Sequence, residues 1–455
     1  MLFKQFCRTS AIAIALAAMP FSAQAETLRE ALATAYTNNP NILSALLDVK
    51  SSAEDIALRK AGKRPTIALS GAVNDSFTIA SGNFSNSTSA NIGLGYNQTL
   101  FDNLRTDAQI EQARALSELS AQALRNAEQN VLLSVVDSYV SIIRDTQLVQ
   151  LRADNVSFYQ AQVGSANERL RIGEGTRIDV SQADARLAQA VASYQSAITS
   201  LQSSQASYQR WVGRAPKNLS QDYGFRGLIP ATVDDALASA DARHPAIMSA
   251  RAAIRASQAG SDAAQAAFGP TLDLIGQIGA SSTFGSTNSS GSSAFSGSVR
   301  MSLSIPLYAG GALGASVRKA NLEQMRSEVD AMATRDQVRE AVVTSWSTLQ
   351  NAAAQIESAQ AAVESGNLVL QGIIQERDVG QRTTLDVLNA QSELTSAREG
   401  LIGATSTRII ASFSLLSAMG RLSAEDLKLP VQIQSADGYT ATVEDVWQEL
   451  RAIAE

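Results

Sequence analysis

The residues whose types and spacing could support chemistry gather in two short segments. The run "GEGTRIDV" starting at Gly173 and the run "GQRTTLDV" starting at Gly380 each place an aspartate three residues after a threonine. At that spacing the hydroxyl and the carboxylate form a capping box, which satisfies free backbone N–H groups at the start of a helix. Asp179 and Asp386 are therefore predicted to stabilise the first turn of a helix.

The rest of the chain offers no catalytic or metal-binding set. His244 is the only histidine, and it stands before Pro245 as Asn39 stands before Pro40, so we expect it to act at the start of a helix. The only cysteine is Cys7, close to the N-terminus. A His-paired nucleophile and a Cys-ligated or transition-metal site both lack their residues. We therefore predict no enzyme activity, no metal and no cofactor.

Residues 1–25 have the pattern of a secretory signal peptide. Lys4 and Arg8 precede an apolar run, and the sequence Ala-Gln-Ala ending at Ala25 is a small-residue cleavage site. A mature chain starting at Glu26 would have no cysteine to carry a lipid anchor. It would hold 35 basic and 43 acidic residues, a net charge of -8. Because phosphate binding needs a basic surface, this charge disfavours nucleic acid as a partner.

The remaining chain is a tandem duplication. The stretch from Thr27 matches the stretch from Thr232 at an offset of 205 residues, and Gly173 matches Gly380 at an offset of 207. A two-residue slip in Gly/Ser/Asn-rich sequence is typical of a loop that differs in length between two copies. We predict two structural repeats and a C-terminal equatorial segment, with the bounds 26–230, 231–430 and 431–455.

Each repeat is predicted to form one very long helix beside a column of two shorter ones. The first long segment has an almost unbroken helical pattern without proline, and at about 1.5 Å per residue it makes a rod about 100 Å long. Glycine ends this rod, and the chain returns along it as an antiparallel coiled coil. The predicted helices are 41–63, 104–172 and 176–211 in the first repeat, and 246–267, 313–378 and 383–419 in the second.

Four further segments alternate apolar and small polar residues, apart from Asp75 and Ile275, which break the pattern. Such strands, with one apolar and one polar face, are typical of a membrane β-barrel with a wet interior. A soluble hairpin packed on a helix is the alternative interpretation. The predicted strands are about 66–80, 88–101, 271–284 and 297–309, joined by polar loops from Ser81 and Gly285.

Four strands cannot close a barrel, because the smallest membrane barrels have about eight and an open edge in lipid is very costly. Three chains would supply twelve. The predicted fold class is therefore α+β: tandem-duplicated long antiparallel coiled-coil helices, plus two two-stranded hairpins that contribute four strands to a twelve-stranded trimeric transmembrane β-barrel.

Several motifs together make the sequence similar to the TolC family of outer-membrane exit ducts, and the match covers essentially the entire mature chain. The resemblance implies a homotrimer whose barrel continues into a periplasmic α-barrel. These motifs are L-x-x-A-L-x-x-A…N-P at 28–40, P-L-Y-x-G-G at 306–311, V-G-x-R-T-x-x-D-V-L at 379–388 and D-G-Y…V-x-D-x-W at 437–447.

What the family does is then expected of this chain. The resemblance implies a passive conduit in the outer membrane of a Gram-negative bacterium, in contact with outer-membrane lipid and extending into the periplasm. It also implies docking to a periplasmic adaptor (membrane fusion) protein and an inner-membrane transporter, in a tripartite efflux pump or a type I secretion system. The exported substrate stays open, and so does the choice between a proton-driven and an ATP-driven transporter.

The resemblance also implies a gate at the periplasmic tip, closed by links between neighbouring coiled coils and by acidic residues that face the pore. Asp386 matches an acid of the constriction ring, Arg382 matches the basic residue of the links, and Asp179 matches a carboxylate that such links use. Asn389 replaces a second ring acid, and Arg377 replaces a link tyrosine. The ring should therefore carry about half the charge, and the links should differ.

Two other interpretations stay open at this point. Arg382 could be a solvated surface charge rather than a link. The whole chain could be a secreted coiled-coil filament protein, although such a protein would not need strands with one apolar face.

Overall fold

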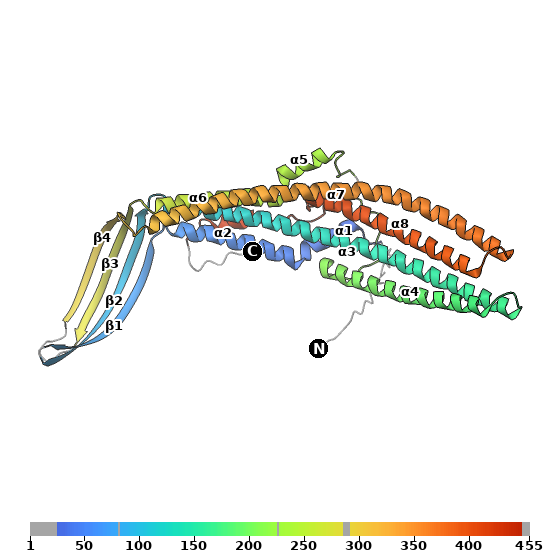
Figure 1. Cartoon of the computed structure of the whole chain (residues 1–455). Helices are drawn as coiled ribbons and strands as arrows, with labels where there is room; N and C mark the ends of the chain where they lie inside the picture. The colour runs from blue at the N-terminus through green and yellow to red at the C-terminus, as the bar shows by residue number, and fades with distance from the viewer. Residues whose placement is uncertain (1–24, 81, 225–226, 285–291, 448–455) are drawn as a thin grey trace, which may run out of the picture.

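The computed structural model describes residues 25–80, 82–224, 227–284 and 292–447. The molecule is a long rod of helices with a curved β-sheet at one end and two free helical hairpins at the other (Figure 1). The proposed signal peptide therefore lies almost wholly outside the described residues. So do the first seven residues of the predicted loop from Gly285 and the last eight residues of the C-terminal segment.

The two halves of the chain repeat the same order of elements, with strands following the second helix of each half. The first half contains α1 (Leu28–Asn38), α2 (Pro40–Ala61), β1 (Thr66–Ala80), β2 (Asn83–Phe101), α3 (Arg105–Arg171) and α4 (Arg177–Val212). The second half contains α5 (Val233–Arg243), α6 (Pro245–Ala266), β3 (Thr271–Phe284), β4 (Ser292–Ser304), α7 (Ala312–Asp378) and α8 (Thr384–Ala418), and α9 (Asp437–Val443) follows.

The long helices α3 and α7 have 67 residues each, which makes each about 100 Å long. The helix pairs α3–α4 and α7–α8 pack lengthwise as two antiparallel hairpins, and α2 and α6 extend the layer toward the sheet (Figure 1). Helix α8 is the one helix among the described residues that is long and apolar enough to cross a membrane by length and composition alone. It packs along α7 and α3.

In each repeat, two helices precede the first strand, where the sequence pattern predicted only one. Helices α1 and α5 were not expected, and each ends immediately before an Asn-Pro or His-Pro pair. Proline cannot donate to the preceding turn but suits the first position of a new helix. The side chains of Asn39 and His244 then accept hydrogen bonds from Asn41 N–H at 2.9 Å and Ala246 N–H at 3.2 Å.

The four strands form one antiparallel sheet in the order β1-β2-β3-β4, so β2 and β3 join the two halves and β1 and β4 are its edges. Two predicted strands had wrong bounds. Strand β2 starts at Asn83 rather than at 88, because the Asn/Ser-rich run that we interpreted as loop pairs with the end of β1. Strand β4 covers Ser292–Ser304 rather than 297–309, because Pro306 cannot donate to a ladder and the serine run before 297 pairs with β3.

One face of the sheet carries the apolar residues, as the alternation predicts. The register places Leu69, Leu94 and Ile278 in one row across three strands. On the other face Thr99 donates a hydrogen bond to Asp273 at 2.8 Å. Asp75 does lie on the apolar face, where Thr88 opposite it donates to its carboxylate at 2.8 Å.

The largest core lies midway along the rod, where α1, α3 and α4 meet the chain after α8. Glu26 is buried there: its carboxylate accepts hydrogen bonds from Tyr208 at 2.5 Å and from Arg214 at 2.7 Å. Ion pairs hold the C-terminal segment against α2 and α3. Lys60 pairs with Asp445 at 2.9 Å, and Arg114 pairs with Glu444 at 2.8 Å.

Candidate functional site at the helical tips

The two duplicated segments form the turns at the free ends of the helical hairpins (Figure 1). Gly173 and Gly380 have φ of 85° and 81°, a left-handed conformation that suits glycine at the end of a helix. The backbone bonds are also repeated: Glu174 N–H donates to the carbonyl of Arg169, and Gln381 N–H to that of Glu376, both at 2.8 Å. The two tips therefore have the same backbone, and their differences lie in side chains.

Asp179 and Asp386 both complete capping boxes, as predicted. Oδ2 of Asp179 accepts from the backbone N–H and the hydroxyl of Thr176 at 2.9 and 2.7 Å. Oδ2 of Asp386 accepts the same two bonds from Thr383 at 2.9 and 2.8 Å. The bond from the Thr383 backbone is the main cause that lowers the pKa of Asp386 below its ordinary value. In both capping boxes the two bonds from the threonine reach the same carboxylate oxygen, Oδ2.

Arg382 pairs within its own hairpin. Its Nε donates to Glu376 Oε2 at 2.8 Å, and this bond is the largest cause that raises the pKa of Arg382. Within the described part of the chain, no hydrogen bond or ion pair joins Arg382 to Asp179. A link between these two residues is therefore not made inside one chain.

Arg377, in contrast, joins the two hairpins. It is 9% exposed, and its Nη1 donates to Oε1 of Gln162 on α3 at 2.8 Å. Nη2 donates to Asp378 at 2.8 Å. The residue that replaces the expected tyrosine thus makes a contact between α7 and α3 of the same chain.

Asn389 also bridges the hairpins. Its Oδ1 accepts from Nη2 of Arg186 on α4 at 3.0 Å. Two residues further along α8, Gln391 donates to Asn155 on α3 at 3.0 Å, and both side chains are buried. The tip therefore contains cross-hairpin hydrogen bonds at the two positions that depart from the family pattern and at Gln391.

Sequence reasoning missed the partners of these contacts, which are Arg186 on α4 and a stripe of residues on α3. Arg152 pairs with Glu399 at 2.6 Å, and the Tyr159 hydroxyl donates to the carbonyl of Leu388 at 3.3 Å. Positions spaced alternately by three and four residues form the seam of a coiled coil, and this spacing could have identified the stripe. Its members are Arg152, Asn155, Tyr159, Gln162, Ala166 and Arg169.

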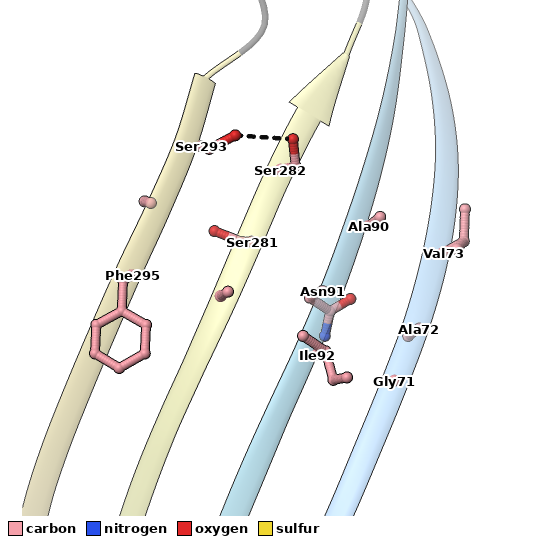
Figure 2. Close-up of a pocket in the computed structure, with 12 residues that line it drawn as sticks. Gly71, Ala72, Val73, Ala90, Asn91, Ile92, Ser281, Ser282, Ser293 and Phe295 are labelled. Carbon is pink, nitrogen blue, oxygen red and sulfur yellow. Dashed lines mark hydrogen bonds between the residues drawn. The ribbon is translucent and has the colours of Figure 1, made fainter.

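The sheet holds a hollow of about 740 Å³, which spans all four strands and is lined by small and apolar residues such as Gly71, Ala90 and Phe295 (Figure 2). Its polar lining residues are serines and Asn91, and none is charged. Among the described residues, no group of three or more His, Cys, Asp or Glu side chains could hold a metal ion.

A sheet with one apolar face and two open edges, continued by a rod of coiled coils that ends in a polar tip, defines a subunit of a membrane-spanning duct. The chain matches the family model described as outer membrane efflux protein over residues 31–214 and 236–421, and it belongs to that family. The family is one of transport ducts rather than enzymes. The resemblance to TolC-family ducts is thereby confirmed.

Individual relatives agree with this assignment. The outer membrane efflux protein BepC of Brucella suis is 34% identical, over 99% of this chain and 98% of that protein. The alkaline protease secretion protein AprF of Pseudomonas aeruginosa is 28% identical, over 74% of this chain and 70% of its own. The crystal structure of the Campylobacter jejuni CmeC outer membrane channel shares the fold, with a TM-score of 0.76, 15% identity and coverage of 92% and 89%. The chain is an exit duct of the Gram-negative outer membrane, of the class that serves efflux or type I secretion.

Proposed function

We propose that three copies of the chain close into one duct, with a twelve-stranded barrel in the outer membrane and an α-barrel in the periplasm. The observation that carries this proposal is the pair of open edges. Among the residues that the structure describes, strands β1 and β4 each lack a neighbour on one side. An unpaired edge in lipid leaves backbone groups without partners, so β4 of one copy would pair with β1 of the next.

The helical layer supports the same closure. Helices α2, α3, α6 and α7 contact one another in that order, so α2 and α7 are the edges of the layer. Each edge exposes an apolar stripe, and α7 of one copy would pack on α2 of the next. These stripes are Leu43, Leu47 and Leu58 on α2, and Leu322, Met325, Val329 and Met332 on α7.

The tip would be the gate of this passive conduit. In a ring of three copies, Asp386 would face the pore as a constriction ring, with the neutral Asn389 one helical turn away. Because Arg382 and Asp179 do not meet inside one chain, a link between them would join neighbouring copies. Arg377 would hold the two hairpins of one copy together through Gln162.

The tip would also dock to the other components, a periplasmic adaptor and an inner-membrane transporter. Each turn exposes two apolar side chains at matching positions, Ile172 and Ile178 in the first and Val379 and Leu385 in the second. Apolar side chains at a solvent-exposed end are typical of a contact surface. The relatives BepC, an efflux protein, and AprF, a protease secretion protein, suggest the two substrate classes for this chain.

Processing before Glu26, without a lipid anchor, is part of the proposal. Glu26 is buried by its contacts with Tyr208 and Arg214, while Ala25 is exposed. A chain cut between these two residues would keep its first residue inside the core.

The function is tested by expressing the full chain and measuring its mass in detergent and its migration on gels with and without heating. A trimer that resists dissociation until heated, recovered from outer membranes, is the expected result. A protein that stays in solution without detergent would instead support the secreted filament and overturn the duct.

A further inference from the structure

The turn between β2 and α3 contains two consecutive residues in the left-handed region, neither of them glycine. Asn103 has φ of 56° and Leu104 has φ of 66°. At the matching positions of the second repeat the chain has Gly310 and Gly311, with φ of 61° and 85°. The turn therefore has the same shape in both repeats, and the second repeat makes it with the residues that suit it best.

The left-handed conformation of Asn103 is explained by a contact of its side chain. Its Nδ2 donates to the carbonyl of Ala266 at 3.1 Å, and its side chain lies where a Cβ on Gly269 would be. Asparagine also tolerates the left-handed region better than other side chains. Asn103 thus fastens the start of α3 to the end of α6.

Among the described residues, no comparable bond explains the left-handed conformation of Leu104. It is the N-cap residue of α3 but makes no side-chain capping bond, and its side chain is 66% exposed. A branched apolar residue in this conformation costs energy that a glycine would not cost. Strain of this kind persists where the side chain has a use, so Leu104 should contact something outside the chain.

The position of Leu104 relative to the sheet indicates what that is. Asp75 and Thr88, and the row with Ser282 and Ser293, interrupt the apolar face toward the far end of the sheet. Below that interruption the apolar rows run from Phe295 to Leu303 along β4. Eight residues at about 3.3 Å, tilted by about 40°, give a height of about 20 Å, whereas the apolar band of such barrels is about 25 Å tall.

Phe77 and Ile79 on β1 are exposed on the same face beyond the interruption, so part of the remaining height lies there, and the rest lies at the helix end of the sheet. A bulge after Thr99 brings Phe101 into the row of Leu272 and Leu303, the last row of the apolar face. Leu104 follows three residues later, and the second repeat exposes Leu307 and Tyr308 at the positions that match Leu100 and Phe101. We call Phe101, Leu104, Leu307 and Tyr308 the junction patch; it would extend the apolar face by about one row.

We propose that the junction patch inserts into the inner leaflet of the outer membrane and that Leu104 is its anchor, which sets the depth of the duct in the bilayer. This inference rests on the proposed function, because it requires the strands to span the membrane. Of the residues in the junction patch, Leu104 gives the clearest test of contact with lipid. It follows β2, which is flanked by β1 and β3 of its own chain, whereas Leu307 and Tyr308 follow the edge strand β4, which a second copy could cover.

The test is spin labelling of single cysteines in the full-length Cys7→Ser chain, purified and reconstituted in phospholipid bilayers. A label at Leu104→Cys is compared with a lipid reference, Val299→Cys on the apolar face, and with a water reference, Glu111→Cys on α3. Cysteine keeps a Cβ at the same φ as leucine, so the variant tests the position without adding strain. Accessibility to oxygen reports lipid, and accessibility to a water-soluble nickel complex reports water.

The expected result is that the Leu104→Cys label resembles the Val299→Cys label, with high oxygen and low nickel accessibility. Nickel accessibility equal to that of Glu111→Cys would place Leu104 in water and overturn the proposal. Low accessibility to both reagents would place it against a second copy and also overturn it. If Val299→Cys itself were exposed to nickel, the membrane-spanning sheet would fail, and the anchor with it.

Discussion

The guanidinium of Arg377 donates a hydrogen bond from Nη1 to Oε1 of Gln162 at 2.8 Å, across 215 positions of sequence. Arg377 is buried although it lies near the free end of a rod. A buried charge needs hydrogen bonds to offset its lost hydration, and Gln162 and Asp378 accept them. This contact fixes α7 to α3 at the tip, which is the gate of the duct in the proposed function.

Substituting Arg377→Met should loosen the tip. Methionine keeps much of the apolar stem but removes every donor and leaves the amide of Gln162 without its partner, which costs about 1–3 kcal/mol. We expect a higher single-channel conductance in planar bilayers. Arg171→Met is the matched control, because Arg171 pairs with Glu168 one turn away on the same helix. Equal conductance in the two variants would contradict a role of Arg377 in closure.

Substituting Asp386→Asn should weaken the block of the channel by multivalent cations, because a ring of three carboxylates becomes neutral. The neighbouring Asn389 adds no charge, so this ring has no second acidic layer to compensate. Thr383→Val removes the hydroxyl from the same capping box but keeps the Asp386 carboxylate, so it is the control for an effect of capping alone. Unchanged cation block in Asp386→Asn would remove the residue from the pore.

Substituting Arg382→Ser should raise conductance if Arg382 links neighbouring copies. Because Arg382 also pairs with Glu376 inside its own hairpin, a variant of Glu376 can separate the two contacts of Arg382. Glu376→Gln weakens that pairing but keeps the guanidinium free to reach Asp179 of a second copy, so it should leave the closed state intact. If both variants raised conductance equally, the intrahairpin pair rather than an intercopy link would hold the tip.

The sequence predicted the long helices and the tip turns because their signals are local. The absence of proline in α3 and α7, glycine at the turns and Thr-x-x-Asp at the next helix each act within a few residues. The missed helices α1 and α5 are 11 residues long, and the Asn-Pro and His-Pro pairs that end them were interpreted only as starts. The first residues of β4 are rich in serine, so they lack the apolar alternation by which a strand is recognised in a sequence.

The cross-hairpin contacts could not be predicted in the same way. Arg186 and Asn389 are 203 positions apart, and their pairing depends on how two separate coiled coils lie against each other. A single departure from a family pattern, such as Arg377, indicates that a contact has changed but not what replaces it. Only the packing of α7 against α3 identifies Gln162 as the partner.

Glu128 gives the core at the middle of the rod a pH dependence. Its carboxylate is buried and accepts the backbone N–H of Ala424 at 2.5 Å. Burial is the main cause that raises its pKa from 4.5 to about 7, against a smaller opposing effect of that hydrogen bond. Between these two values the folded chain holds a proton that the unfolded chain releases. The stabilisation is therefore complete below pH 4.5 and is lost as the pH rises through 7.

Substituting Glu128→Gln should remove this dependence, because glutamine accepts the same hydrogen bond from Ala424 and carries no charge to bury. At pH 8 we expect the variant to be more stable than the natural chain, by up to about 3 kcal/mol, with little difference at pH 4.5. The thermal midpoint of the purified protein, measured at several pH values between 4.5 and 8, gives the comparison. Glu425→Gln is the control, because Glu425 is exposed and its negative charge contributes only a little to the raised pKa of Glu128. A midpoint that falls in parallel for Glu128→Gln and the natural chain would show that another group titrates, since the protonation of Glu128 can contribute only where its carboxylate is present.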